Sequence, residues 1–255
     1  MSASPPASND ESYGAFAYAY DRGLGELFFQ AVRPLLSDML EKYPTSKRTH
    51  LDLACGTGLA MEFFARQGFR STGVDISLPM LRMARKRGTK LVAADIRALA
   101  LRRTFARITC LYDSLNHMLA REDLVAAFRS VRGVMDHDSL FFFDMNHPDI
   151  YPEVWGMNEP YVSEGREYRL EIATTYRKRD KLAQGLVSGW ALMNGERVPI
   201  RETHKQRAYK EKDIVAALAD ARLEPVDIFD FDPFHESDAL HGAGVKLFFV
   251  VRATQ

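Results

Sequence analysis

The most constraining feature of this chain is a tight glycine turn between an apolar segment and a helical pattern. Residues 51–58 read Leu-Asp-Leu-Ala-Cys-Gly-Thr-Gly, and an amphipathic helical pattern begins directly after them. Glycines let backbone N–H groups approach a ligand closely, and the N-terminus of the following helix attracts negative charge. The pattern predicts a strand–turn–helix unit that binds a nucleoside-containing cofactor.

Two other nucleotide-binding motifs fit this turn less well. The dinucleotide fingerprint places a small residue three positions after Gly58, where the helix packs closely on the strand. Met61 stands there instead, which disfavours a nicotinamide dinucleotide. The phosphate loop of nucleoside triphosphatases needs Gly-Lys-Ser/Thr, and the sequence lacks it.

The next two predicted strands both end in an acidic residue. Residues 69–77 predict a second strand ending at Asp75, and residues 91–96 predict a third ending at Asp95. In a doubly wound sheet, a carboxylate after the second strand accepts hydrogen bonds from ribose hydroxyl groups. Taken alone, Asp75 could equally cap a helix and Asp95 could be a loop acid. The glycine turn favours a binding role for both.

Strands and helices alternate through the first part of the chain, which predicts a parallel sheet with right-handed crossovers. Two helical stretches come first, with a kink or break expected at Pro34. The other strands are predicted at 49–54, 108–112, 140–145, 226–231 and 246–251, and the other helices at 58–67, after Pro79, at 123–135 and at 211–221.

The pattern changes after the fifth strand. Tyr168, Leu170 and Ile172 alternate with polar residues, as in a half-buried strand, and Asn194-Gly195 is a strong hairpin signal. We predict a three-stranded antiparallel insertion over residues 158–209. Its apolar face must cover something, and the carboxyl-end rim of the sheet is the natural place.

These segments together resemble the class I S-adenosylmethionine (SAM) methyltransferases, in which Asp-x-x-x-Gly-x-Gly follows the first strand. Three further stretches, at 13–21, 112–117 and 202–209, extend the resemblance to bacterial small methyltransferases with an inserted sheet, a group similar to natural-product N-methyltransferases. The resemblance implies a doubly wound, seven-stranded, mostly parallel, Rossmann-like α/β sheet that an antiparallel hairpin closes. We therefore divide the chain into a flexible tail (1–10), a SAM-binding core (11–157 and 210–255) and the insertion (158–209).

The resemblance also implies the cofactor site, with SAM as methyl donor and no metal. Asp75 is expected at the ribose and Asp95 at the adenine amino group. Tyr20 either closes over the methionine end or simply packs in the core. The residues assigned to the cofactor are Tyr20, Ala54, Cys55, Gly56, Thr57, Gly58, Asp75, Ile76, Met80, Asp95, Ile96, Tyr112, Asp113 and His117.

Residues for the methyl acceptor are harder to read, because a direct displacement depends mainly on holding the reactants in line. His117 follows the fourth strand and is the candidate base, or else a rim histidine that packs on the cofactor. Tyr151 and Trp155 wall the acceptor or anchor the insertion. His204 faces the site or pairs with acids on the outer face of the inserted sheet.

Charge and composition narrow the class of protein. The chain has 34 basic and 34 acidic residues, so it has little drive to bind nucleic acid or membranes. Its two cysteines lack metal-ligand spacing, and no signal peptide or apolar run near 18 residues is present. We expect a cytoplasmic protein, either a monomer or a homodimer.

Three functions stay open at this point. The first is methyl transfer to an N or O atom of a small molecule. The second is RNA methylation, perhaps on a modified base, since arginine-rich runs lie within 82–90 and 97–107; a solvated helix face explains those runs better. The third is a SAM-binding protein without activity.

Overall fold

The computed structural model of the chain describes residues 9–88, 90–157, 159–232 and 245–254. Its centre is a seven-stranded sheet in the order β10-β11-β5-β4-β1-β2-β3. β1 to β5 run parallel to their neighbours, and β11 pairs antiparallel with both β5 and β10. The doubly wound, mostly parallel sheet is confirmed. The strands are β1 (Thr49–Leu53), β2 (Arg70–Asp75), β3 (Leu91–Ala93), β4 (Arg107–Cys110), β5 (Leu140–Asn146), β10 (Leu223–Phe231) and β11 (Lys246–Ala253).

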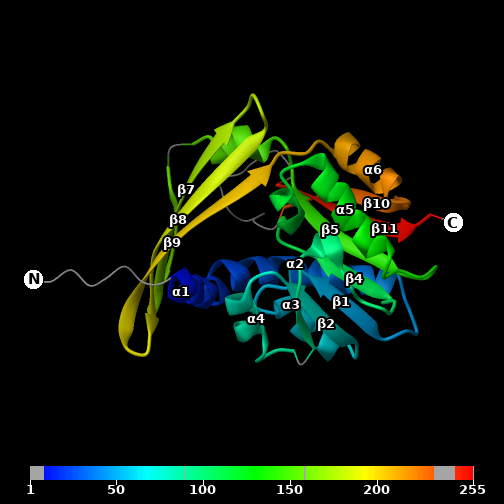
Figure 1. Cartoon of the computed structure of the whole chain (residues 1–255), viewed down its shortest axis with the longest axis horizontal. Coiled ribbons are helices and arrows are strands. Elements are labelled where there is room, and N and C mark those ends of the chain that lie inside the picture. Colours follow the sequence, from blue (N-terminus) through cyan, green and yellow to red (C-terminus); the bar gives the residue numbers. More distant parts are fainter. Residues whose placement is uncertain (1–8, 89, 158, 233–244, 255) are drawn as a thin grey trace, which may run out of the picture.

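Helices cover both faces of this sheet (Figure 1). Phe141 and Phe143 of β5 point to the face that α5 and α6 cover, and Phe142 between them points to the face of α2 and α3. A continuous apolar run in a central strand is what two covered faces require. The helices are α1 (Asn9–Arg22), α2 (Leu24–Lys42), α3 (Leu59–Arg66), α4 (Leu78–Ala84), α5 (Arg121–Arg132) and α6 (Glu211–Asp220).

The N-terminal region differs from the prediction in two ways. Asn9 and Asp10 belong to α1, so the predicted flexible tail is too long by these residues, and the rest of it, 1–8, lies outside the described residues. Pro34 lies inside α2 without ending it. Val32 and Leu36 on either side of Pro34 are fully buried. Their packing holds the helix together across the hydrogen bond that proline removes.

The insertion is a separate antiparallel sheet of four strands, in the order β6-β7-β8-β9. The prediction of three strands missed β6, a short edge strand that is mostly exposed and has no apolar alternation. One face of this sheet packs on α1, where Leu170, Val187 and Ile200 meet Phe16. The long strands therefore stand beside the core sheet rather than extend it (Figure 1). The strands are β6 (Tyr161–Gly165), β7 (Tyr168–Arg177), β8 (Leu182–Met193) and β9 (Glu196–Arg207).

Phe143 should be a principal stability contact of the core. Its ring is fully buried and stacks on Phe249 of β11 at a centroid distance of 4.6 Å. We expect Phe143→Ala to lower the free energy of unfolding by about 3–5 kcal/mol, because it leaves a cavity. Leu27→Ala, at a half-exposed position of α2, should cost no more than about 0.5 kcal/mol. Urea unfolding measures both, and equal losses would contradict this picture of the core.

Candidate functional site

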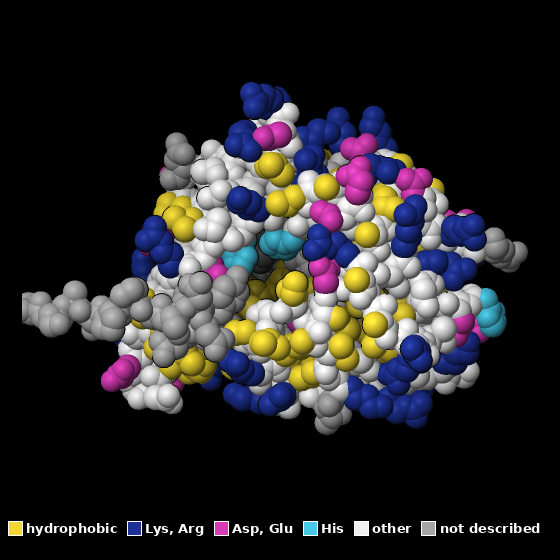
Figure 2. All heavy atoms as spheres, viewed as in Figure 1, with side chains coloured by type: hydrophobic (Ala, Val, Ile, Leu, Met, Phe, Trp, Pro, Cys, Tyr) yellow, Lys and Arg dark blue, Asp and Glu magenta, His cyan; other side chains and the backbone are white. Residues whose placement is uncertain are grey.

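A cavity of about 640 Å³ opens at the carboxyl ends of β1, β2 and β4. Its other walls come from α1, which contributes Phe16 and Tyr20, and from the inserted sheet, which contributes His204 and Gln206. Figure 2 shows the hollow between the two parts of the molecule, with histidine and hydrophobic side chains at its edge. Ligands of open α/β sheets bind at this end of the strands.

The glycine turn forms one end of the cavity and is fixed by Asp75. The backbone at Gly56 and Gly58 is left-handed, with φ of 52° and 87°. One carboxylate oxygen of Asp75 accepts the Gly56 N–H at 2.8 Å, and the other accepts the Ser77 N–H at 2.8 Å. Burial raises the pKa of Asp75, while these N–H groups oppose the shift. A carboxylate has about four acceptor sites, so Asp75 can still accept a hydrogen bond from a ligand.

Gly58 has a different place from the one predicted. It is not among the residues that line the cavity. It is instead the N-cap of α3, and a Cβ there would lie 3.2 Å from the Cβ of Ala84. Its left-handed φ and this close approach to α4 explain the glycine, so its contribution to the site is the shape of the turn.

Asp95 lines the cavity but is already engaged. Its carboxylate caps a short 3-10 helix, η1 (Ile96–Ala98), and pairs with the Arg97 guanidinium at 2.5 Å. The hydrogen bonds from Arg97 lower the pKa of Asp95. The sequence leaves Asp95 as either an adenine-binding residue or a loop acid; the structure places it at the cavity wall, where it also caps η1.

The turn after β4 is the most constrained part of the site. Tyr112 and Asp113 both have left-handed backbones, with φ of 65° and 47°. Asp144 of β5 accepts the N–H groups of both residues, at 2.7 and 2.9 Å. This pairing gives Asp144 a structural role at the site. A non-glycine residue holds such a backbone only where its surroundings impose it.

A buried lysine completes this part of the site. Lys246 of β11 is 3% exposed and donates to Asp113 at 2.5 Å, to Asp144 at 2.9 Å and to Asn146 at 3.1 Å. Burial would lower the pKa of Lys246, but the two carboxylates hold it above its usual value. Burial likewise opposes ionisation of Asp113, and Lys246 keeps the pKa of Asp113 below its usual value. We call Lys246, Asp113 and Asp144 the buried ion cluster.

The inserted sheet is hydrogen-bonded directly to the buried ion cluster. Gln206 of β9 donates to Asp113 at 2.5 Å and accepts a hydrogen bond from the Tyr151 hydroxyl at 2.9 Å. Asn116 donates to the Arg207 carbonyl oxygen at 2.9 Å. Asp113 and Gln206 both line the cavity, so its floor joins residues of the core and of the insertion.

The predicted acceptor residues separate into two groups. His117, Trp155 and His204 line the cavity, and the two histidine rings lie 6.0 Å apart. Tyr151 does not line the cavity: it is fully buried, stacks on Tyr176 and lies against Trp155 at a tilted angle. This position fits the alternative that Tyr151 anchors the insertion and does not wall the acceptor. Burial lowers the pKa of His204 to about 4, so its ring is neutral at pH 7.

Tyr20 lies where it can cover the glycine turn. Its ring is near Gly56, 4.0 Å from the position of an added Cβ, and 5.8 Å from the Tyr112 ring. Burial raises the pKa of Tyr20 well above its usual value, so the hydroxyl stays neutral. Ala54, Cys55, Thr57, Ile76, Met80 and Ile96 also line the cavity.

Sequence reasoning missed three polar residues of the site, namely Asp52, Gln206 and Lys246. Asp52 was visible as the first residue of the turn motif but was given no role. Gln206 and Lys246 stand in β9 and β11, far along the chain from their partners. Gln206 lies within the 202–209 stretch of the resemblance but was given no role, and no local pattern marks Lys246.

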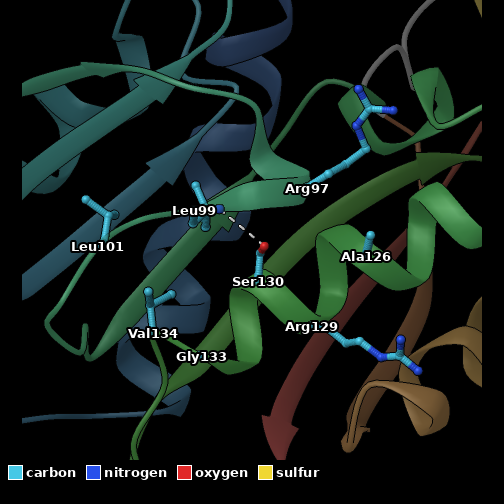
Figure 3. A pocket seen from close by; sticks show the side chains of 8 residues that line it. All are labelled: Arg97, Leu99, Leu101, Ala126, Arg129, Ser130, Gly133 and Val134. Atoms are coloured by element: carbon cyan, nitrogen blue, oxygen red, sulfur yellow. Dashed lines mark hydrogen bonds between the residues drawn. The ribbon is translucent and has the colours of Figure 1, made fainter.

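A second depression, of about 380 Å³, lies between η1 and α5 (Figure 3). Its polar groups are Ser130, which accepts the Leu99 N–H, and the guanidinium groups of Arg97 and Arg129. Arg97 already holds Asp95 and Asp123. This depression therefore offers no convergent set of free polar groups.

Within the described part of the chain, one exposed group, Asp136, His137 and Asp138, has the geometry to hold a metal ion. The Lys47 ammonium already pairs with both of its carboxylates, at 3.1 and 3.2 Å. It lies outside the cavity lining. A search of the described helices finds none with the length and hydropathy needed to cross a membrane.

Comparisons with known proteins agree with this geometry. A family model described as a methyltransferase domain matches residues 51–138. The protein YqeM of Bacillus subtilis (strain 168) is 26% identical over 239 residues, which cover 89% of this chain and 94% of that protein. The dTDP-3-amino-3,6-dideoxy-alpha-D-glucopyranose N,N-dimethyltransferase of Streptomyces fradiae is 29% identical over 119 residues, 45% of this chain and 46% of that protein.

The fold also matches a solved structure. An S-adenosylmethionine-dependent methyltransferase from Clostridium acetobutylicum ATCC 824 has a TM-score of 0.79 at 24% identity. The match covers 94% of this chain and 98% of that one. The inserted sheet is therefore part of the shared architecture.

Asp75→Ala should weaken SAM binding by about 1.5–3 kcal/mol, or about 10- to 150-fold in Kd, through loss of charge-assisted hydrogen bonds. Asp220→Ala, at a half-exposed acid on α6, is the matched control. Isothermal titration calorimetry measures both dissociation constants. An unchanged Kd for Asp75→Ala would remove this carboxylate from the cofactor site.

Proposed function

Because the chain is a class I S-adenosylmethionine-dependent methyltransferase, we propose that it methylates a nitrogen atom of a small-molecule amine. The observation that carries this proposal is the charge at the floor of the cavity. The buried ion cluster contains one ammonium and two carboxylates, and Asp113 faces the cavity. With both carboxylates ionised, the cluster has a net charge of −1.

This charge distinguishes between acceptor atoms. A neutral amine gains positive charge as its nitrogen forms the new bond to carbon, and a nearby negative group stabilises that charge. A phenolate or carboxylate acceptor is already negative, so the same cluster repels it. Burial raises the pKa of Asp144, but its carboxylate accepts three hydrogen bonds, from Tyr112, Asp113 and Lys246, as an ionised carboxylate does.

The residues at the other end of the cavity fit SAM, which supplies an electrophilic methyl group when bound. Asp75 presents two oriented oxygens for the ribose, and the open turn at Gly56 gives the backbone room to approach a ligand. Asp95 and Ile96 are assigned to the adenine, and Tyr20 to the methionine end. These roles leave Asp113, His117 and His204 for the acceptor.

The two histidines fit an amine in complementary ways. Nε2 of His204 is buried and has no hydrogen-bond partner among the described residues. The neutral ring lines the cavity, so it can contact the acceptor amine without adding a positive charge beside it. His117 lies at the exposed rim and is the group assigned to carry away the proton after transfer.

The inserted sheet is assigned to the acceptor side. Ile172, Gly185, Val187, His204 and Gln206 all line the cavity from this sheet. The Streptomyces fradiae relative is named for N-methylation of a dTDP-linked amino sugar, which supports an amine acceptor here. Two basic residues behind the RNA alternative, Arg87 and Arg97, are held in ion pairs with acids.

Asp113→Asn tests the charge argument directly. We expect at least about a tenfold fall in kcat/KM for an amine acceptor, which is about 1.4 kcal/mol of lost transition-state stabilisation. SAM affinity should change little, since Asp75 and the glycine turn are untouched. Asp220→Asn again serves as the control. A rate unchanged in Asp113→Asn would refute the role of the cluster charge.

The acceptor itself can be found without guessing its identity. The purified enzyme is incubated with SAM deuterated in the methyl group and with a small-molecule extract from its own organism. Mass spectrometry should find the label on nitrogen in small molecules. Label found mainly on oxygen, or in RNA with binding that weakens steeply with salt, would overturn the proposal.

A further inference from the structure

A row of polar side chains crosses the core sheet beneath the glycine turn. Nδ1 of His50 lies 2.9 Å from the Ser71 hydroxyl, and Nε2 of His50 lies 2.9 Å from the Thr109 hydroxyl. Thr109 is in turn 2.6 Å from a carboxyl oxygen of Asp52. Ser71, His50 and Thr109 belong to three neighbouring strands, β2, β1 and β4. Asp52 ends the row at the cavity wall.

His50 is neutral, which restricts how protons can be arranged along the row. The ring is fully buried and stacks on Phe64 at 3.7 Å, and burial lowers the pKa of His50 to about 3. A neutral imidazole has one N–H donor and one acceptor nitrogen. All hydrogen bonds in the row must therefore point in the same direction from donor to acceptor, and the tautomer of His50 determines that direction.

In the first arrangement Asp52 is protonated. Its O–H donates to Thr109, Thr109 donates to Nε2 of His50, and the Nδ1–H of His50 donates to Ser71. Ser71 then donates to the Met61 carbonyl oxygen, which lies 3.3 Å away. Every proton in the row has an acceptor.

In the second arrangement Asp52 is ionised and the row reverses. Thr109 donates to Asp52, the Nε2–H of His50 donates to Thr109, and Ser71 donates to Nδ1 of His50. The row has lost one proton, and no member is left without a partner. A buried network normally suffers when a proton is removed, because a polar group loses its hydrogen bond. This one accommodates the loss by a change of tautomer at His50.

The surroundings of Asp52 favour its protonated form when the cavity is empty of cations. Asp52 is 3% exposed, and Thr109 is the one residue of the described part of the chain that hydrogen-bonds to its carboxyl group. Burial raises the pKa of Asp52 to about 7, and the Asp75 charge adds to the shift. The other titratable groups that interact with Asp52 are His50 and the thiols of Cys55 and Cys110. Further along the cavity lie Asp95, Arg97, Asp113 and His117.

We propose that Asp52 is a proton-linked specificity residue: below neutral pH it is protonated in the free protein, and it ionises when SAM binds, while His50 changes tautomer. The displaced proton passes to solvent, and the carboxylate balances positive charge on the bound molecule. SAM carries a sulfonium and an ammonium group, whereas the product S-adenosylhomocysteine has lost the sulfonium charge. The row therefore favours SAM over its product, and the preference increases as Asp52 ionises.

Isothermal titration calorimetry in buffers of different ionisation enthalpy tests this linkage. At about pH 6, SAM binding should release up to about one proton, and this release should fall as the pH rises through 7. Below pH 7 the affinity for SAM should rise up to about tenfold for each unit of pH increase, and the affinity for S-adenosylhomocysteine should rise less. Asp52→Asn should abolish the proton release. Asp75→Asn tests the neighbouring carboxylate as the other possible proton source: it should bind SAM more weakly but keep the proton release per molecule bound.

Three results of the calorimetry would overturn the proposal. They are proton release that persists in Asp52→Asn, proton release that is lost only in Asp75→Asn, and no proton release from the wild type at about pH 6. Nuclear magnetic resonance of the His50 ring nitrogens in the free protein gives a second readout that needs no bound cofactor. A tautomer change centred near pH 7 should occur in the wild type and Thr109→Ser, but not in Asp52→Asn or Thr109→Val. A single tautomer across this range, or an imidazolium, would equally overturn it.

Discussion

The buried ammonium of Lys246 is the interaction on which the rest of this structure depends. A lysine with almost no exposure must be paired, because an isolated charge in the interior is very unfavourable. Its partners come from two separate segments, the turn after β4 and the end of β5. The pairing therefore fixes the register of β11 beside β5 and the conformation of the turn at the same time.

The same cluster connects the core to the inserted sheet. The carboxylate oxygens of Asp144 hold the left-handed backbone at Tyr112 and Asp113. The Asp113 side chain in turn accepts a hydrogen bond from Gln206 of β9. Removing the lysine would leave two carboxylates close together in a dry environment. The arrangement is costly in stability, and it supplies a fixed negative charge at the cavity floor, beside which we propose that an acceptor nitrogen binds.

The parts of the site that sequence reasoning predicted are those that local chemistry determines. The glycine turn, Asp75 and the strand–helix alternation all follow from short segments whose patterns allow few structures. Lys246 and Gln206 could not be predicted, because their partners lie 133 and 93 residues away along the chain. Tyr151 was assigned to the acceptor because it follows β5, but its direction is set by packing on Tyr176 of β7. The edge strand β6 lacks the alternation that marks its neighbours, so only pairing with β7 reveals it.

We propose that one cavity has a cofactor end at Asp75 and an acceptor end at Asp113. A crystal structure of the protein with S-adenosylhomocysteine tests this division most directly. We expect the ribose hydroxyl groups to bind the Asp75 carboxylate and the sulfur to face the space bounded by Asp113, His117 and His204. A product molecule that covers Asp113, or whose sulfur points away from this space, would contradict it.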